Sequence, residues 1–549
     1  MSRVLENPSN ICMQSCRGTA ALLLFSATLA LGVPRNDLVP MPKIRPEDPS
    51  RFFPLAVRLD GAEVTEVAAL FRKAAREDLA LQVEKSRALR AVPPDASVLT
   101  ALLGASSDRV KEWSLRGLGE HRGDKSAATP ALLAIACDPK ADEICRALAV
   151  RVLGTTQIES ATIGKLAEQI GTGSKEFSAL LLEIIGGAGE QAKPVVSALR
   201  KQLSAPEALV QYYAYEALQK LDAAEQQEAS NYLAVVDNPN SPGYLRAIAL
   251  QKLLSQGEDP KAVRAVIDSV GHPDSFISEL AGNVLQRMDG ISSAGVAALG
   301  SGLDHGDARV RVQSAVALRR LGTNAFSAIP SITDLLRQAV KGEARVRETG
   351  ICLDILRAQG TNATPASGAV AALLPEQSPI YRNVQKHEVD RFRGFVFFTL
   401  AEIGVPKEAV PFVADALANS DERMSYAFAG AARAAGALQA DAAQLVPHLV
   451  RPLEKDTPQD VLDFDEFEAH SATRGEYTTG QIEILRALRR IGPPARSALP
   501  VVRAFESRAV DWITSADGPK RIPRVSDEAR QTLAVLESTR TAQLQSQHE

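Results

Sequence analysis

A pair of cysteines is the first feature of this 549-residue chain whose residue type and spacing could do chemistry. Cys137 and Cys145 flank a short polar segment, residues 138–144, which we expect to join two antiparallel helices. In an exported protein that geometry permits a disulfide, so we predict a Cys137–Cys145 bridge, with two buried free thiols as the alternative. Because the loop is short, the loop-entropy model gives the bridge a stabilisation of about 2–3 kcal/mol. Cys352 lies between Ile351 and Leu353, where we expect a core thiol rather than a nucleophile.

The histidines and the acidic residues offer no clear metal site. No two histidines have the spacing of a helical metal-binding pair, and we expect all seven on the surface or in loops: His121, His272, His305, His387, His448, His470 and His548. Residues 460–468 carry carboxylates dense enough to attract Ca²⁺. They lack the turn glycine of a calcium loop, and Phe464 and Phe467 interrupt them. We therefore expect a solvated acidic loop, with partner docking and a metal site as alternatives.

The charge balance argues against nucleic-acid binding. The chain has 62 Lys and Arg residues against 66 Asp and Glu residues, a net charge of −4, which leaves no basic excess to neutralise phosphates. Five arginines could line a concave helical face, although we expect them to be solvated helix flanks: Arg311, Arg319, Arg320, Arg489 and Arg490. The sequence contains no phosphate-binding glycine loop, nucleophile elbow or haem-attachment motif. We predict no catalytic residue, no cofactor, no metal site and no small-molecule substrate.

A repeated sequence motif predicts the secondary-structure elements that must position these residues. Its clearest copy, residues 307–322, has Asp307 in a turn, an apolar–basic pair at Val310-Arg311, and a Leu318-x-x-Leu321-Gly322 ending. The column of the last apolar residue advances in steps of 32 to 36 residues through Leu118, Leu153, Ile185, Leu221, Leu254, Met288, Leu321 and Leu356, and resumes at Ile403, Ala435 and Ile491. The steps that end at Ile403 and at Ile491 are longer than the others, and they indicate insertions at residues 375–390 and 453–478.

The pattern within one repeat predicts a pair of antiparallel helices. Val310, Ser314, Ala315, Leu318 and Leu321 recur at three- and four-residue spacing, which gives the second helix a single apolar stripe. Small residues on that stripe let neighbouring helices approach closely. Glycine after the last leucine suits a left-handed helix cap, and proline early in the next element suits a first helical turn. Each pair leaves apolar surface on both flanks and is stable only when stacked, so we expect almost no strand.

These residues resemble HEAT repeats, especially the HEAT-like type named after phycobilisome lyases. Asp307, Val310-Arg311, Ala315 and Leu318-x-x-Leu321-Gly322 carry the resemblance, which extends over about residues 95–540. It implies an all-α, right-handed superhelical solenoid of about 12 helix pairs, stabilised by an Asp before and an Arg within each second helix. Copies such as Phe276-Ile277 and Leu209-Val210 lack the Arg, so this ladder is discontinuous. A tetratricopeptide array has a similar period, but its diagnostic Trp, Gly-Tyr and Phe positions are absent.

The N-terminus has the features of an export signal. Arg17 precedes an apolar run at residues 19–31, which is long enough for a signal-peptide core but short for a membrane span. We predict a signal peptide at residues 1–32, with an uncleaved anchor as the alternative, and a Pro-rich linker at 33–55. A helical stretch at 61–89, within a cap at residues 56–94, should cover the first repeat. The repeats occupy residues 95–540, and a polar tail follows at residues 541–549.

Aromatic residues mark two further places where a partner could bind. Phe392, Phe395, Phe397 and Phe398 follow the insertion at 375–390, and we expect them mostly in the core. The insertion is either a partner-holding loop or a neutral length variant. Trp512 lies in a late loop, where it is either an exposed anchor or buried.

The sequence as a whole indicates a non-catalytic, exported scaffold, periplasmic or extracellular, that binds an unidentified protein along an extended surface. Two alternatives remain. One is a HEAT-like lyase or lyase-subunit enzyme, which the resemblance implies but an export signal opposes. The other is an envelope module tethered to a membrane, which requires that the N-terminal segment is not cleaved.

Overall fold

A computed structural model of the chain describes residues 56–90, 96–222, 232–288, 290–342, 346–419, 423–455, 457–459, 461–463, 477–508, 512–515 and 518–545. The predicted signal peptide (1–32), the linker (33–55) and most of the acidic run (460–468) lie outside these residues. The chain divides into two compact units. Unit 1 takes the described residues up to Lys252 together with His272–Asn283, and unit 2 takes Leu253–Gly271 and the described residues from Val284 onward.

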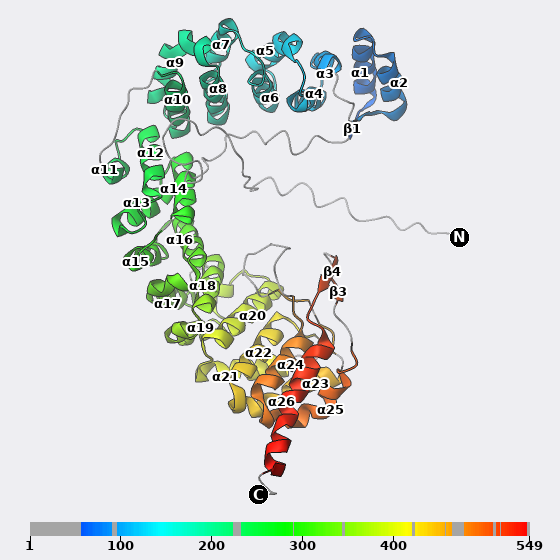
Figure 1. Ribbon diagram of the computed structural model, residues 1–549, viewed down its shortest axis with the longest axis vertical. Helices are drawn as coiled ribbons and strands as arrows, with labels where there is room; N and C mark the ends of the chain where they lie inside the picture. Colours follow the sequence, from blue (N-terminus) through cyan, green and yellow to red (C-terminus); the bar gives the residue numbers. More distant parts are fainter. Residues whose placement is uncertain are drawn as a thin grey trace. The chain divides into compact units, whose positions relative to one another are not determined.

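Unit 1 is a stack of short helices, drawn from blue to green in Figure 1. It contains α1 (Gly61–Lys73), α2 (Glu77–Ser86), α3 (Ala96–Leu102), α4 (Asp108–Glu120), α5 (Thr129–Cys137), α6 (Glu143–Leu153), α7 (Ser160–Ala167), α8 (Lys175–Gly187), α9 (Val196–Lys201), α10 (Ala208–Lys220), α11 (Tyr232–Asp237) and α12 (Gly243–Leu253, whose last residue belongs to unit 2). From α3 onward the even-numbered helices are the second members of the pairs, and α4, α6, α8 and α10 pack in a row.

Unit 2 continues the same alternation in its own stack. It contains α13 (Pro260–Val270), α15 (Ser293–Gly302), α16 (Ala308–Arg320), α17 (Ile329–Ala339), α18 (Val346–Gln359), α19 (Ser367–Ala371), α20 (Lys386–Ile403), α21 (Val410–Ala418), α22 (Tyr426–Ala437), α23 (Val446–Glu454), α24 (Gly480–Ile491), α25 (Leu499–Ala504) and α26 (Val525–Gln545). Helix α14 (Ser275–Arg287) spans the boundary between the units. Figure 1 shows α15, α17, α19 and α21 along one side of this unit and α16, α18, α20 and α22 along the other.

The all-α helical-repeat class predicted from the sequence is confirmed. Among the described residues, strands are confined to two short antiparallel pairs, β1 (Ala56–Arg58) with β2 (Ala88–Arg90), and β3 (Trp512–Ser515) with β4 (Gly518–Arg521). Gly322 has φ +54°, the left-handed cap expected after a repeat's last leucine. Pro330 lies in the first turn of α17, as expected.

Most residues of the predicted apolar column lie in the core. Leu118, Leu153, Ile185, Leu356 and Ile403 are fully buried. The register is wrong by one residue at Leu254, because the buried side chain there is Leu253. Leu321 is half-buried, because it follows the last residue of α16 and caps that helix.

One arginine in several second helices donates hydrogen bonds to the first helix of its own pair or to the turn that joins the two helices. Arg311 Nη1 donates to the carbonyls of His305 and Gly306, both at 3.0 Å. Arg146 Nε donates to the Ala136 carbonyl at 3.2 Å, and Arg393 Nε to the Leu374 carbonyl at 2.9 Å. These donors satisfy backbone carbonyls at the end of the first helix and in the turn after it, so each arginine ties the two helices of its own hairpin together.

The predicted helical stretch at 61–89 consists of two helices, α1 and α2. Helix α1 starts with a capping box, in which Asp60 and Glu63 exchange hydrogen bonds, and ends at a turn where Ala75 has φ +56°. Helix α2 then folds back on α1, and the β1–β2 pair closes the hairpin. No glycine or proline marks this turn, so the pattern gave no sign of it.

Candidate functional site

The predicted disulfide is not formed in the structure: Cys137 and Cys145 are free thiols. The Cys137 Sγ atom contacts the Lys165 carbonyl of α7, whereas the Cys145 Sγ atom lies 3.5 Å from the Asp108 carbonyl of α4. The α5–α6 hairpin therefore directs its two sulfur atoms to opposite neighbours. Burial raises the pKa of both thiols, that of Cys145 to about 12, so neither is an activated nucleophile. Cys352 is fully buried, as predicted.

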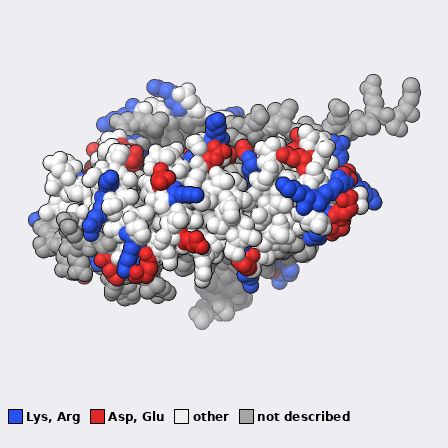
Figure 2. Space-filling view, turned by 90° about the horizontal axis from the view of Figure 1, so that it is seen from above, with Lys and Arg blue, Asp and Glu red and all other residues white. Residues whose placement is uncertain are grey.

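The described part of the chain contains no group of three His, Cys, Asp or Glu residues arranged to hold a metal ion. None of its helices combines the length and apolarity needed to cross a bilayer. Figure 2 shows basic and acidic side chains interspersed on one face of the described residues, without a large field of one sign.

The insertion at 375–390 packs against the core through its middle residues, whereas residues 382–383 and 385–388 are exposed. Ile380 and Tyr381 are buried, the Tyr381 hydroxyl donates to the Leu373 carbonyl at 2.7 Å, and its ring meets Phe392 edge-on at 5.7 Å. Phe392, Phe395 and Phe397 are in the core, as predicted, while Phe398 is half-buried at the surface of α20. The ends of the 453–478 insertion are held by short bridges, Met424 to Gln459 and Leu462 to Thr478.

Three of the five predicted arginines, Arg311, Arg319 and Arg489, are not simply solvated flanks, and for these three the sequence interpretation is wrong. In unit 2 they pair with carboxylates on the next second helix along the stack. Arg311 on α16 lies 3.0 Å from Glu348 on α18, and Arg319 lies 3.6 Å from Asp354, which Arg357 also contacts at 2.7 Å. Both acids are buried. Arg320 and Arg490 are the exposed members of the set.

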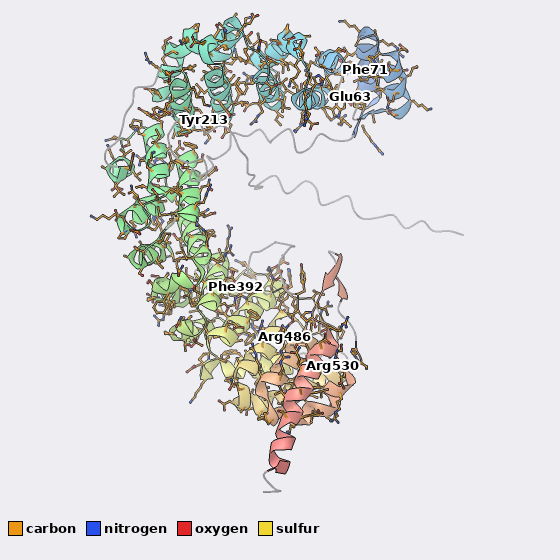
Figure 3. The ribbon with its side chains drawn as sticks, in the orientation of Figure 1. Glu63, Phe71, Tyr213, Phe392, Arg486 and Arg530 are labelled. Carbon is orange, nitrogen blue, oxygen red and sulfur yellow. The ribbon has the colours of Figure 1, made fainter. Side chains whose placement is uncertain are left out.

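Farther along unit 2 the same face becomes richer in arginine. Glu528 on α26 accepts hydrogen bonds through both carboxylate oxygens, from Arg486 Nε at 3.0 Å and from Arg489 Nη1 at 3.0 Å. Arg486 also lies 3.2 Å from Glu483, a carboxylate that is almost fully buried. Arg433 on α22 lies 3.7 Å from Glu402 and 3.8 Å from Glu483. Figure 3 labels Arg486 in this region, with Phe392 on α20 of the same unit.

We define the arginine face as these second-helix guanidinium groups of unit 2: Arg311, Arg319, Arg357, Arg433, Arg486, Arg489 and Arg490. At its C-terminal end a cavity of about 280 Å³ is lined by Arg433, Arg486, Ala487, Arg489, Arg490 and Glu528, which we call the arginine pocket. Beside it, the half-buried Phe398 ring lies between two guanidinium groups, 4.9 Å from Arg357 and 4.0 Å from Arg433. Arginine stacked on an aromatic face gains a cation–π attraction and keeps its edge donors available.

Burial and neighbouring charges act in opposite directions on two guanidinium groups of the pocket. Burial lowers the pKa of Arg433, in spite of the nearby Glu483 and Glu402 carboxylates. Burial also disfavours the Arg486 cation, but the attraction of Glu483 and Glu528 outweighs it and raises the pKa of Arg486. Both side chains stay charged at neutral pH, and Arg433 is the less well compensated cation.

Helix α10 of unit 1 carries different side chains. On α10, the Tyr212 hydroxyl donates to Glu216 at 2.6 Å, and Tyr215 stacks on Tyr244 at 5.1 Å. Burial raises the pKa of Glu216, and it raises the pKa of Tyr213, which is labelled in Figure 3. This cluster favours uncharged groups, whereas the arginine face holds charged ones.

A signal for the arginine face was present in the sequence. Arg311 and Glu348 are 37 residues apart, and Arg319 and Asp354 are 35 apart, which is about one repeat. Residues one repeat apart lie side by side in a stacked array, so opposite charges at that separation predict an ion pair.

Comparisons with known proteins give no family. No protein-family model and no curated protein matches the chain. Among solved structures, an engineered protein aligns with 18% identity and a TM-score of 0.36, over 80% of this chain and 98% of its own length. The karyopherin Kap121p bound to RanGTP aligns with 11% identity and a TM-score of 0.40, over 86% of this chain and 56% of its own. Kap121p bound to the extreme C-terminus of the phosphatase Cdc14p gives 15% identity and 0.32, over 85% and 59%.

The chain thus spans a little more than half the length of these karyopherins. Likenesses at these TM-scores carry no argument about what this chain binds, so its function has to be inferred from the chemistry of the arginine face.

Proposed function

We propose that this chain is a non-catalytic scaffold, exported from the cytoplasm, that binds another protein along the second helices of unit 2. The observation that carries this proposal is the half-buried Phe398 ring held between Arg357 and Arg433. Arginine and aromatic side chains are enriched at the centres of protein interfaces, where they supply most of the binding energy.

The surroundings of these side chains support the same function. The arginines are held by cross-helix carboxylates and by packing, so binding a partner would immobilise few additional rotamers.

Site-specific photo-crosslinking tests the proposal. The chain carries p-benzoylphenylalanine in place of Phe398 and is irradiated in its native compartment. The matched control replaces Phe326, which is 56% exposed and lies in the turn Gly322–Ala328 of the same unit. We expect a covalent adduct with a specific protein from position 398 and none from position 326. Adducts from neither position, or from position 326 alone, would contradict the proposal.

Export has its own test. N-terminal sequencing of the chain recovered from the exported fraction should give a start near Val33, whereas an intact N-terminus in a membrane fraction would support the tethered alternative.

A further inference from the structure

The arginine pocket has one more positive charge than its surroundings balance. Four guanidinium groups line it, on α22 and α24. Three carboxylates pair with them: Glu402, Glu483 and Glu528. Four positive charges against three negative ones leave a net charge of +1. A cavity of about 280 Å³ beside this excess is larger than one carboxylate requires.

The excess charge is located on Arg490. Its side chain is exposed, and among the described residues it has neither an ion pair nor a hydrogen bond. The other three pocket arginines each have a carboxylate within 4 Å. A guanidinium presents several N–H donors in one plane, so Arg490 can bind a planar carboxylate through two parallel hydrogen bonds.

We propose that the arginine pocket binds the carboxylate of an Asp or Glu side chain from an extended acidic segment of the partner protein. This inference rests on the proposed function, and it names the chemistry of the contact. Arg490 provides the fork of donors. Arg433 also lines the pocket and lies 3.7 Å from Glu402 and 3.8 Å from Glu483.

The charge count selects a carboxylate over a phosphate. A carboxylate has one negative charge, which matches the net +1 of the pocket. A phosphate monoester carries about 1.5 to 2 negative charges at neutral pH and would face the Glu528 carboxylate on the pocket wall. Phe398 shares Arg433 with the pocket, so an apolar residue next to the acid would pack on its ring.

Fluorescence anisotropy with a defined peptide tests the inference on the full mature chain. The probe is a dye-labelled, C-terminally amidated decapeptide of alternating Glu and Ala, and its control is the Gln–Ala peptide with the same dye. We expect the Glu peptide to bind more tightly, with an affinity that falls as salt is added. R490E should weaken binding about tenfold, because it replaces the unpaired donor with a repelling charge. R490K should weaken binding less than R490E does, because a lysine keeps the positive charge but cannot form the two parallel hydrogen bonds.

The matched control variant is R337E on α17. It makes the same change in net charge at an exposed arginine of unit 2, whose partner among the described residues is Asp334. We expect it to alter the affinity less than about twofold. Thermal unfolding of both variants separates lost binding from lost structure.

Four results would each overturn the inference. They are equal affinity for the Glu and Gln peptides, equal effects of R490E and R337E, tight binding of a Gln–Ala peptide with a free C-terminus, and displacement of the Glu peptide by phosphate more readily than by acetate. The proposed function fails separately, because photo-crosslinking from position 398 does not depend on Arg490. If a partner crosslinks at position 398 and also binds the R490E variant normally, the proposed scaffold function would stand and the inferred acidic contact would be ruled out.

Discussion

The two units use the same backbone packing and place different chemistry on it. In unit 1 a Cβ on Gly186 of α8 would lie 2.6 Å from the Ala217 Cα of α10. In unit 2 a Cβ on Gly430 of α22 would lie 2.5 Å from the Gly394 carbonyl of α20. Both pairs of second helices are thus in close backbone contact. Beside these contacts, however, α10 carries buried tyrosines and a glutamate with a raised pKa, while α20 to α26 carry arginines.

The difference shows that stacking and surface chemistry are set by separate positions of the repeat. The apolar stripe and the small residues determine how closely helices approach. The flanking positions are free to hold either arrangement. The neutral cluster satisfies its polar groups within α10, as in the Tyr212–Glu216 hydrogen bond, and the ion pairs do so through neighbours one repeat away.

The largest expected contrast comes from the same substitution made in both units. In unit 2, E483Q removes a buried charge that holds Arg433 and Arg486, so we expect a loss of about 3 kcal/mol in the free energy of unfolding. In unit 1, E216Q replaces a carboxylate whose burial already favours the neutral form, and its amide oxygen can still accept from Tyr212. We expect a change within about 0.5 kcal/mol there.

Urea unfolding measures the change in the free energy of unfolding for both variants. Hydrogen exchange is read separately in α24 and in α10. Because the chain has two compact units, the two helices need separate readings. Equal losses from E483Q and E216Q would break the comparison between a charged and a neutral face.

The shared packing predicts a smaller, parallel effect in the two units. G186A and G430A each force a methyl group into backbone of the neighbouring helix, at an overpacking cost of about 1–3 kcal/mol that the helix propensity of alanine offsets by about 1 kcal/mol. We expect both to be destabilising. G187A and G368A are the controls, because nothing lies within 4 Å of a Cβ at either position, and neither should destabilise. Thermal unfolding distinguishes the two pairs, and a stabilised G430A would show that α20 and α22 are not in close contact.

The two units should also respond differently to pH. Burial raises the pKa of Glu216 above its ordinary value of 4.5, so folded unit 1 binds this proton more tightly than the unfolded chain does. The resulting stabilisation is present below that ordinary value and is lost as the pH rises through the raised one. We expect E216Q to abolish this part of the pH dependence of unit 1 unfolding, measured between pH 4 and pH 8. A wild-type and an E216Q profile that stay parallel would show that Glu216 is not shifted.

Much of the fold followed from the sequence, because its determinants are local and periodic. The buried Val310, Ser314, Ala315 and Leu318, the left-handed Gly322 and the first-turn Pro330 were all predicted from spacing. The number of helix pairs and the hand of the superhelix stay predictions.

The surface could not be predicted in the same way. A solvated arginine and a cross-helix ion pair have the same local sequence, and Arg319 pairs with Asp354 only because the repeats stack in register. The cysteines illustrate the same limit: their spacing in one hairpin permits a bridge, but α5 packs against α7 and α6 against α4, which directs the two thiols apart.

Thiol labelling has the smallest expected effect of these experiments, and it tests the predicted disulfide directly. In the folded chain we expect Cys137 of unit 1, which is half-buried, to react slowly with a thiol reagent, and buried Cys145 and Cys352 to be protected. Quantitative labelling in denaturant without reductant then counts the reactive thiols of the mature chain. Three would support the free thiols, and one would restore the Cys137–Cys145 bridge.

Hydrogen exchange of the full mature chain, with and without the Glu–Ala decapeptide, tests the central claim most directly. If the arginine face is the binding surface, the peptide will slow exchange in α22, α24 and α26 and leave α8 and α10 unchanged. Slower exchange in α8 and α10 instead, or none in α24, would contradict the account.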